Sequence, residues 1–326
     1  MKESPTILGN ALDFVKADCG SYSSYVMDLE RAQYQFIVNP KAGRGKTQAI
    51  LPALRHLLDT ENLPCEFLFT SGPGDATALA REAIRKGCGY VVAVGGDGTV
   101  HEIANALVDT TAALGVIPTG SGNDFCKAVQ IPLQLANAVE TVVRGQLRRV
   151  DVGRLGKEYF VNGLGIGLDG AVSHRYGRMK RLRGEWGYLW GAIHEALTFK
   201  AQYIHLKTAD WSHSGRALLA GVSNGQYHGG NFKLAPHAVV DDGLFDIYVI
   251  GDMFPLKRLL EIPKVRKGTH LGMPEVETRR APWVEITSES SLLAHMDGEP
   301  FQLEPGNHRI ELVPRSLQVI CAEDPL

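Results

Sequence analysis

Cysteine is scarce in this sequence, and long apolar runs and an excess of one charge are missing. The 326 residues contain five cysteines, scattered without a Cys-x-x-Cys pair or a Cys/His cluster at zinc spacing. An odd, dispersed set is typical of reduced thiols in a cytoplasmic protein. These absences predict a chain without a disulfide framework and without a structural zinc site.

Membrane spanning and nucleic-acid binding are disfavoured on similar grounds. No apolar run approaches the ~18 residues that a membrane-spanning helix needs. The net charge of −2 gives no general attraction to nucleic acid. Residues 1–33 lack an apolar signal core and are too acidic for a transit peptide, so we treat them as an N-terminal extension. We expect a cytoplasmic protein whose contact with membranes is peripheral and transient.

The length suits two domains, and the pattern of apolar residues changes near residue 148. Before that point, short apolar runs alternate with amphipathic stretches. Strands are expected at 35–38, 65–69, 90–94 and 114–117, and helices at about 46–58, 75–86, 100–107, 124–129 and 133–144. This order predicts a doubly wound parallel sheet over residues 34–147, with ligands bound beyond the carboxyl ends of its strands.

Short strand-like runs separated by glycine turns fill residues 148–308, with one helix expected near 187–199. This pattern predicts a mostly antiparallel, β-rich domain. Residues 309–326 contain two alternating runs and predict a C-terminal hairpin. An unpaired edge in either sheet could pair with a second copy, which leaves a homodimer open.

The run Val91–Thr99 carries the strongest functional signal. Four apolar residues precede Gly95-Gly96-Asp97-Gly98-Thr99, and a helical repeat follows. Glycines and the free N–H groups of a helix start commonly bind phosphate. Asp97 beside a phosphate would be repelled unless a cation such as Mg²⁺ lay between them. The alternative is that these glycines only form a tight turn.

Two further glycine-rich turns follow predicted strands. Residues 39–47 nearly match a P-loop, but Pro40 stands at the first glycine position. Their N–H groups and Lys46 could still bind phosphate. Residues 118–124 hold more polar side chains than one helix cap requires, which favours nucleotide contact. These side chains are Thr119, Ser121, Asn123 and Asp124.

Two acidic turns lie in the β-rich half. Asp241-Asp242-Gly243 suits a turn, or a metal site built from one aspartate and neighbouring carbonyl groups. Asp297-Gly298-Glu299 follows a predicted strand. Two such carboxyl groups suit a general base with a partner that orients it or binds metal, and a plain hairpin turn is the alternative.

A basic stretch at 174–183 precedes a helix that has large apolar side chains on one face. These side chains are Trp186, Trp190, Ile193 and Leu197. Positive charge beside tryptophan suits an anionic bilayer surface. Packing of the stripe into the domain core is the more common explanation for such a pattern.

Together these motifs resemble the diacylglycerol kinase catalytic-domain superfamily, most closely its soluble bacterial lipid kinases, with sphingosine kinases as relatives. The matching residues keep the family's order over about residues 34–322: Asn39-Pro40 with Gly43, Gly95–Thr99 with Glu102, Pro118-x-Gly120-x-x-Asn123-Asp124, Ala235-Pro236 with Asp242-Gly243, and Asp297-Gly298-Glu299. Ser121 replaces the family's usual threonine and keeps the hydroxyl. Gly-Gly-Asp-Gly-Thr alone also occurs in NAD kinases, and the downstream motifs make the match specific.

The resemblance implies an α/β nucleotide domain, a β-sandwich-like acceptor domain, an active site in the cleft between them, and a tail that returns to the first domain. It also implies ATP as a substrate. The expected nucleotide-binding residues are Asn39, Pro40, Lys41, Ala42, Gly43, Thr70, Gly95, Gly96, Asp97, Gly98, Thr99, Val100, His101, Glu102, Gly120, Ser121 and Asn123.

Acidic residues take three roles in this resemblance. Asp297 or Glu299 would be the catalytic base. Asp97 would lie near the catalytic Mg²⁺. A structural Mg²⁺ would be held by one side chain and two backbone groups, those of Asp242, Val239 and Leu244.

We therefore expect an ATP- and Mg²⁺-dependent kinase that phosphorylates the hydroxyl of a lipid such as diacylglycerol. The motifs do not identify the lipid. Three alternatives remain: an NAD-kinase-like enzyme with a soluble acceptor, a catalytically inactive binding protein, and a P-loop NTPase that uses Lys46 and Thr47.

Overall fold

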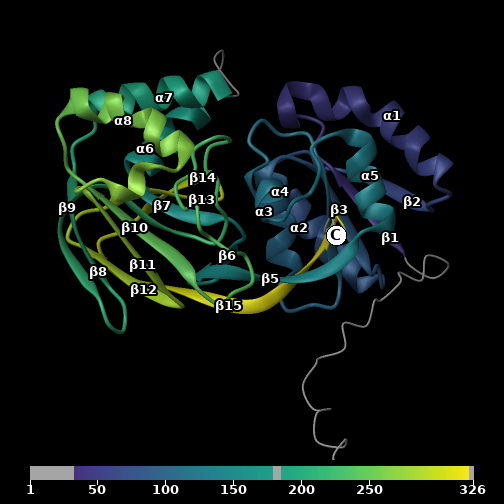
Figure 1. The fold of residues 1–326 in the computed structure, drawn as a ribbon. Helices are drawn as coiled ribbons and strands as arrows, with labels where there is room; N and C mark the ends of the chain where they lie inside the picture. The colour runs from purple at the N-terminus through teal and green to yellow at the C-terminus, as the bar shows by residue number, and fades with distance from the viewer. Residues whose placement is uncertain (1–32, 179–184, 323–326) are drawn as a thin grey trace, which may run out of the picture.

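The computed structural model describes residues 33–178 and 185–322. An α/β region and a β-rich region lie side by side, with strands β5 and β15 running between them (Figure 1). Among the residues described, no helix is both long enough and apolar enough to cross a bilayer.

The α/β region contains four parallel strands in the order β2-β1-β3-β4. Their bounds are β1 Tyr34–Val38, β2 Cys65–Phe69, β3 Tyr90–Gly95 and β4 Ala113–Pro118. The helices are α1 Lys46–Thr60, α2 Asp75–Arg85, α3 Asp97–Leu107, α4 Asp124–Ala128 and α5 Leu135–Arg144, with a short 3₁₀ turn, η1, at Ala42–Gly45. The predicted parallel sheet is confirmed.

Alternation along the strands explains why helices cover both faces of this sheet. Val91 and Ala93 of β3 pack in the same apolar cluster as residues of α2 and α3. Val92 and Val94 pack in another cluster, with residues of α1 and α5. The sheet is therefore buried on both faces, and ligands can reach it at the carboxyl ends of its strands.

The β-rich region is mainly antiparallel, as predicted, and follows the order β14-β13-β7-β9-β8-β12-β15, with β10 and β11 extending from β9. Its strands are β5 Gln146–Leu155, β6 Glu158–Phe160, β7 Gly163–Gly167, β8 Gln202–Lys207, β9 Ser212–Ser223, β10 Phe245–Gly251, β11 Val276–Ala281, β12 Trp283–Ser288, β13 Leu292–Met296, β14 Glu299–Leu303 and β15 Gly306–Cys321. A short 3₁₀ turn, η2, spans His270–Gly272.

Three helices cover one side of the β-rich region (Figure 1). They are α6 Leu168–Arg178, α7 Glu185–Thr198 and α8 Pro255–Lys267. The expectation of a single helix in this half was wrong. Two glycines interrupt the pattern of α6, and Pro263 lies within α8, so neither segment shows a clean helical repeat in the sequence.

Strand β15 joins the two regions. The hairpin predicted for the C-terminal residues is wrong, because residues 306–321 form one continuous strand with an irregularity between Val313 and Leu317. Its first half pairs with β12, and its second half pairs in parallel with β4. Strand β5 pairs with β15 in the antiparallel direction on both sides of this irregularity. This shared strand, β15, ties the two regions together through pairs at Ala113 and Leu114, the first residues of β4.

Candidate active site

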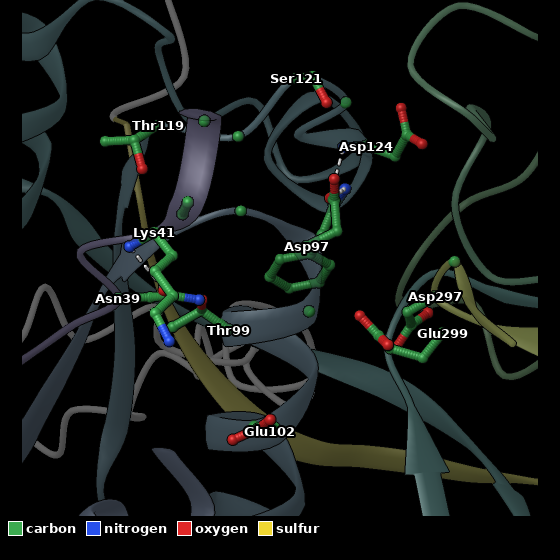
Figure 2. Close-up of a pocket in the computed structure, with 18 of the residues that line it drawn as sticks. Asn39, Lys41, Asp97, Thr99, Glu102, Thr119, Ser121, Asp124, Asp297 and Glu299 are labelled. Carbon is green, nitrogen blue, oxygen red and sulfur yellow. Dashed lines mark hydrogen bonds between the residues drawn. The ribbon is translucent and has the colours of Figure 1, made fainter. Parts of the chain in front are cut away.

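A cavity of about 710 Å³ opens between the two regions. One wall consists of the turns that follow β1, β2, β3 and β4, and the other consists of α6 and the loops after β6, β9 and β13. In the view of Figure 2, Asn39 and Lys41 lie on one side, Asp97 lies in the middle, and Asp297 and Glu299 lie on the other side.

Most residues expected at the nucleotide line this cavity. They are Asn39, Lys41, Ala42, Gly43, Thr70, Gly96, Asp97, Gly98, Thr99, Glu102, Gly120 and Ser121. Five others do not line it, namely Pro40, Gly95, Val100, His101 and Asn123. Val100 is buried in the core, and His101 contacts Asp297 instead. Nucleotide contact itself stays a prediction.

Glycines let the turns after β1, β3 and β4 pack directly on one another. A Cβ atom on Gly120 would lie 2.6 Å from the Cα atom of Gly96 and 2.7 Å from Oδ1 of Asn123. Asn39 also donates its side-chain N–H to Oγ1 of Thr99 at 3.2 Å. The wall that faces the cavity is therefore mostly backbone, which suits a ligand rich in phosphate oxygens.

The first turn does not have the chemistry of a P-loop. Gly43, Arg44 and Gly45 have positive φ angles within it. Thr47 is fully buried, and its hydroxyl contacts the carbonyl of Ala42 at 3.3 Å and Oγ1 of Thr119 at 2.6 Å. In a P-loop this hydroxyl binds Mg²⁺, so the structure disfavours a P-loop NTPase.

Asp97, in the turn after β3, holds the turn after β4 in place. Its carboxylate accepts the backbone N–H groups of Asn123 and Asp124, both at 2.7 Å, and of Phe125 at 3.4 Å. These are orphan donors at the start of α4, so Asp97 caps a helix 26 residues away in sequence. The N-cap residue Asn123 makes no capping bond with its own side chain, so a local cap does not account for the polar residues of this turn.

Burial and the neighbouring Asp124 carboxylate raise the pKa of Asp97 to about 7, although the three N–H bonds act in the opposite direction. Asp124 accepts the N–H of Gly230 at 2.9 Å and pairs with Lys127 at 3.4 Å. Two carboxyl groups thus share one part of the wall (Figure 2). A bound cation would relieve their repulsion.

Glu102 plays a similar capping role. Its carboxylate accepts the N–H groups of Gly74 at 2.9 Å and of Ala76 at 3.0 Å, at the start of α2. It therefore positions the turn after β2, which contributes Thr70 and Ser71 to the cavity. The sequence motif that contains Glu102 gave no sign of this role.

The two acidic residues of the β13–β14 turn, Asp297 and Glu299, differ strongly in their hydrogen bonds and in the direction of their pKa shifts. Asp297 accepts the N–H groups of Val161 at 2.9 Å, Asn162 at 2.8 Å and Gly163 at 3.0 Å, and its Oδ2 lies 2.8 Å from Nδ1 of His101. Burial alone would raise the pKa of Asp297, but these donors lower it below its usual value. Asp297 is consequently a poor proton acceptor.

Glu299 is the available carboxylate. No hydrogen bond joins its side chain to another residue in the described part of the chain. It opens into the cavity beside the helix start of α3, where a Cβ atom on Gly98 would lie 2.5 Å from Oε1 of Glu299. The residue is still exposed to solvent at the cavity, and partial desolvation by the surrounding protein raises the pKa of Glu299. A carboxyl group that has a raised pKa and no side-chain hydrogen bond is the better candidate for a base.

Sequence reasoning missed a buried polar cluster in the second wall, where two of its residues, His228 and His295, line the cavity. Asp169, His228 and His295 form the one group of three or more His, Cys, Asp or Glu residues in 33–178 and 185–322 whose side chains approach closely enough to share a cation. Nε2 of His295 lies 2.9 Å from Oδ2 of Asp169, and Nε2 of His228 lies 2.7 Å from Oγ of Ser223. Only His295 had a sequence signal, as it lies two residues before Asp297.

The expected structural Mg²⁺ site lies away from the cavity. The Asp242 carboxylate accepts the N–H of Leu244 at 3.1 Å and forms an ion pair with Arg280. Val239 is exposed. A divalent cation at Asp242 would have to compete with the Arg280 guanidinium, so these residues do not fit a resident metal as they stand.

Comparison with known proteins agrees with the fold and the motifs. Residues 33–155 match the diacylglycerol kinase catalytic domain, and residues 163–321 match the YegS C-terminal NAD kinase beta sandwich-like domain. The two matches together cover both regions of the structure.

Relatives cover most of the chain. A Chromohalobacter salexigens protein named "Probable lipid kinase YegS-like" is 33% identical over 255 residues, which are 77% of this chain and 81% of the relative. A diacylglycerol kinase of Staphylococcus saprophyticus is 28% identical over 284 residues, 85% of this chain and 92% of that protein. The crystal structure of a candidate diacylglycerol kinase from Bacillus anthracis has a TM-score of 0.76 at 26% identity, covering 90% of this chain and 96% of that one. The chain therefore belongs to the YegS-like lipid kinases of the diacylglycerol kinase family.

Proposed function

We propose that this protein transfers the γ-phosphoryl group of ATP, with Mg²⁺, to the hydroxyl of a lipid such as diacylglycerol. The single observation that carries the proposal is the position of Glu299. An unengaged carboxyl group with a raised pKa faces the glycine turn and helix start that suit a phosphate. Such a pair of elements is what phosphoryl transfer to an alcohol requires.

The α/β wall would position the donor. Its turns present backbone N–H groups, and Lys41, Arg44 and Lys46 line the same side of the cavity. Positive charge and fixed N–H donors would neutralise the phosphate oxygens. Mg²⁺ would supply further neutralisation, and the repulsion between Asp97 and Asp124 supports a cation near them.

The β-rich wall would position the acceptor. Glu299 would accept the proton of the attacking hydroxyl, and Asp297 would act as a positioning residue that fixes the turn through three N–H bonds and His101. Ser173 and Tyr176 of α6 line the cavity on this side. The acceptor hydroxyl would thus reach the phosphate from the β-rich region.

The first test is phosphoryl transfer from labelled ATP to a panel of lipids in mixed micelles, with Mg²⁺. A labelled lipid that is lost with Glu299→Gln would support the proposal and identify the acceptor. Labelling of a soluble acceptor such as NAD, with no labelled lipid, would overturn it in favour of the NAD-kinase-like alternative. Binding of ATP without any turnover would indicate a catalytically inactive protein.

A further inference from the structure

Helix α7 has its amphipathic pattern turned outward. Its inward face is made of small residues, with Gly187, Gly191, Ala192 and Ala196 buried. Its outward face carries the large apolar side chains, so that Trp186 is 76% exposed and Trp190 is 48% exposed. Ile193 and Leu197 are exposed as well. The interpretation of this stripe as domain core is therefore wrong.

Helix α8, which packs beside α7, also exposes large apolar side chains. Leu256 and Leu260, one helical turn apart, are 65% and 69% exposed, and Phe254 precedes them at 81%. Arg258 of α8 donates to the carbonyl groups of Ala196 and Phe199 at the end of α7, at 3.2 and 2.8 Å. The two helices lie together on one side of the β-rich region (Figure 1). Contiguous exposed apolar surface usually marks a docking site for a protein or a membrane.

The charge of α8 distinguishes between a protein partner and a membrane as the occupant of this surface. Helix α8 contains five basic residues and one acidic residue, although the whole chain has a net charge of −2. Lys264 and Lys267 are exposed, with Lys264 paired to Glu261 at 2.7 Å, and Lys257 and Arg258 pair with Glu275 and Asp252 outside the helix. A two-fold dimer through this face would bring two copies of the basic helix together, which like-charge repulsion opposes. An anionic bilayer offers the opposite charge together with an interface that tryptophan favours.

A second cavity of about 90 Å³ lies under these helices and is almost entirely apolar. Val172 of α6, Ala192 of α7 and Val265 of α8 help to line it. Ser173 and Tyr176 of α6 line the active-site cavity. A single helix therefore separates an apolar space under the exposed surface from the proposed site of phosphoryl transfer.

We propose that α7 and α8 form the surface with which this protein docks on anionic bilayers. Trp186, Trp190, Leu256 and Leu260 insert between the lipids, and Lys264 and Lys267 face the anionic headgroups. Docking places α6 and the acceptor side of the cavity next to the bilayer. The purpose of this surface rests on the proposed function, but the binding itself can be measured without catalysis.

The test is flotation of the full-length protein with vesicles of phosphatidylcholine alone or mixed with phosphatidylglycerol. The docking variant carries Trp186→Ser, Trp190→Ser, Leu256→Ser and Leu260→Ser. We expect its partition coefficient on the mixed vesicles to fall by about tenfold or more, because four apolar side chains no longer leave water. The charge variant, Lys264→Gln with Lys267→Gln, should lose roughly tenfold on mixed vesicles and little on phosphatidylcholine.

The matched control removes exposed apolar side chains elsewhere, with Leu133→Ser and Tyr203→Ser. It should bind as the parent protein does, and circular dichroism should show that all variants are folded. Equal binding of parent and docking variant would overturn the proposal. A dimeric parent that becomes monomeric in the docking variant would also overturn it, in favour of a subunit interface.

Activity separates this proposal from the proposed function. With a short-chain diacylglycerol dissolved as monomers, the docking variant should keep the parent's rate, and with vesicle-embedded diacylglycerol its rate should fall in parallel with binding. If the parent binds mixed vesicles through this surface but phosphorylates no lipid in either form, docking stands and the proposed function fails. If the parent is active on the dissolved lipid but does not bind vesicles, the reverse holds.

Discussion

The two walls of the cavity hold their carboxyl groups in different ways. On the α/β wall, Asp97 and Glu102 each accept backbone N–H groups at a helix start. On the β-rich wall, Asp297 is held likewise, but Glu299, two residues away, is not. A carboxylate that caps a helix keeps the backbone in place, whereas one without such partners has its oxygens available to a substrate hydroxyl. The contrast assigns structure to the first three and chemistry to the last.

The sharpest test of this contrast replaces each member of the β13–β14 turn. Glu299→Gln should lower kcat by roughly 10²- to 10⁴-fold, the usual effect of losing a general base. Its melting temperature should stay close to that of the parent, because the side chain of Glu299 makes no hydrogen bond within the described residues. Initial rates on the lipid found as acceptor, together with thermal unfolding, measure both effects.

Asp297→Asn is the matched variant for that test. It leaves a buried site with fewer acceptors for the N–H groups of Val161, Asn162 and Gly163, so the free energy of unfolding should fall by about 1–3 kcal/mol. If Asp297→Asn melted like the parent while losing all activity, the assignment of the base to Glu299 would be wrong.

Asp97 makes the second comparison, through pH. In the folded protein the pKa of Asp97 is about 7, whereas an unfolded chain releases this proton near pH 4. The folded state holds more protons between these values, so this group makes the free energy of unfolding fall as pH rises through that window. The Asp97→Asn variant lacks this group and should show a flatter pH profile, by up to about 1.4 kcal/mol per pH unit.

Denaturant unfolding from pH 4.5 to pH 7.5 checks this, in chelator and without nucleotide. At low pH the Asp97→Asn variant should be no more stable than the parent, since a protonated aspartate and an asparagine carry the same charge. Parallel profiles for parent and variant would show that Asp97 is ionised in the folded protein throughout, against the present assignment.

Two glycines of the α/β wall provide a third comparison. Gly120 and Gly72 both line the cavity, but only Gly120 is packed against other atoms. Gly120→Ala would place its Cβ 2.6 Å from Gly96, so the free energy of unfolding should fall by about 1–3 kcal/mol and ATP affinity should weaken. Gly72→Ala meets nothing within 4 Å and should change neither quantity appreciably. Calorimetric titration with ATP and unfolding curves for both variants measure the difference.

The sequence was a good guide to what is local and repeated. Runs such as Val91–Val94, each followed by a glycine turn and a helix, predicted the parallel sheet and the edge that carries the cavity. The pairing of Asp97 with α4 and of His295 with Asp169 joins residues 26 and 126 positions apart, and no local pattern reports such a pairing. Such pairings can be predicted only once it is known which strands and helices lie next to one another in the fold.

Helix α7 shows a second limit. Periodicity indicated that Trp186, Trp190, Ile193 and Leu197 share a face, but it could not give the direction of that face. The opposite face holds Gly187 and Gly191, and such small residues permit close packing of a helix against the protein. The size of the residues opposite a stripe therefore carried the information that the stripe itself lacked.

The smallest expected effect concerns Asp242, the acidic residue predicted to bind a structural Mg²⁺. Its carboxylate pairs with Arg280 at the surface of the β-rich region, so Asp242→Asn and Arg280→Gln should each change the free energy of unfolding by only about 0–1 kcal/mol. We also expect Mg²⁺ without nucleotide to change the melting temperatures of the parent and of Asp242→Asn by the same amount, because the guanidinium already balances this carboxylate. A rise that depends on Mg²⁺ and disappears in Asp242→Asn, but not in the Asp241→Asn control, would restore the metal site. Asp241 suits this comparison because it pairs with Arg148, so its loss removes a neighbouring ion pair of the same kind.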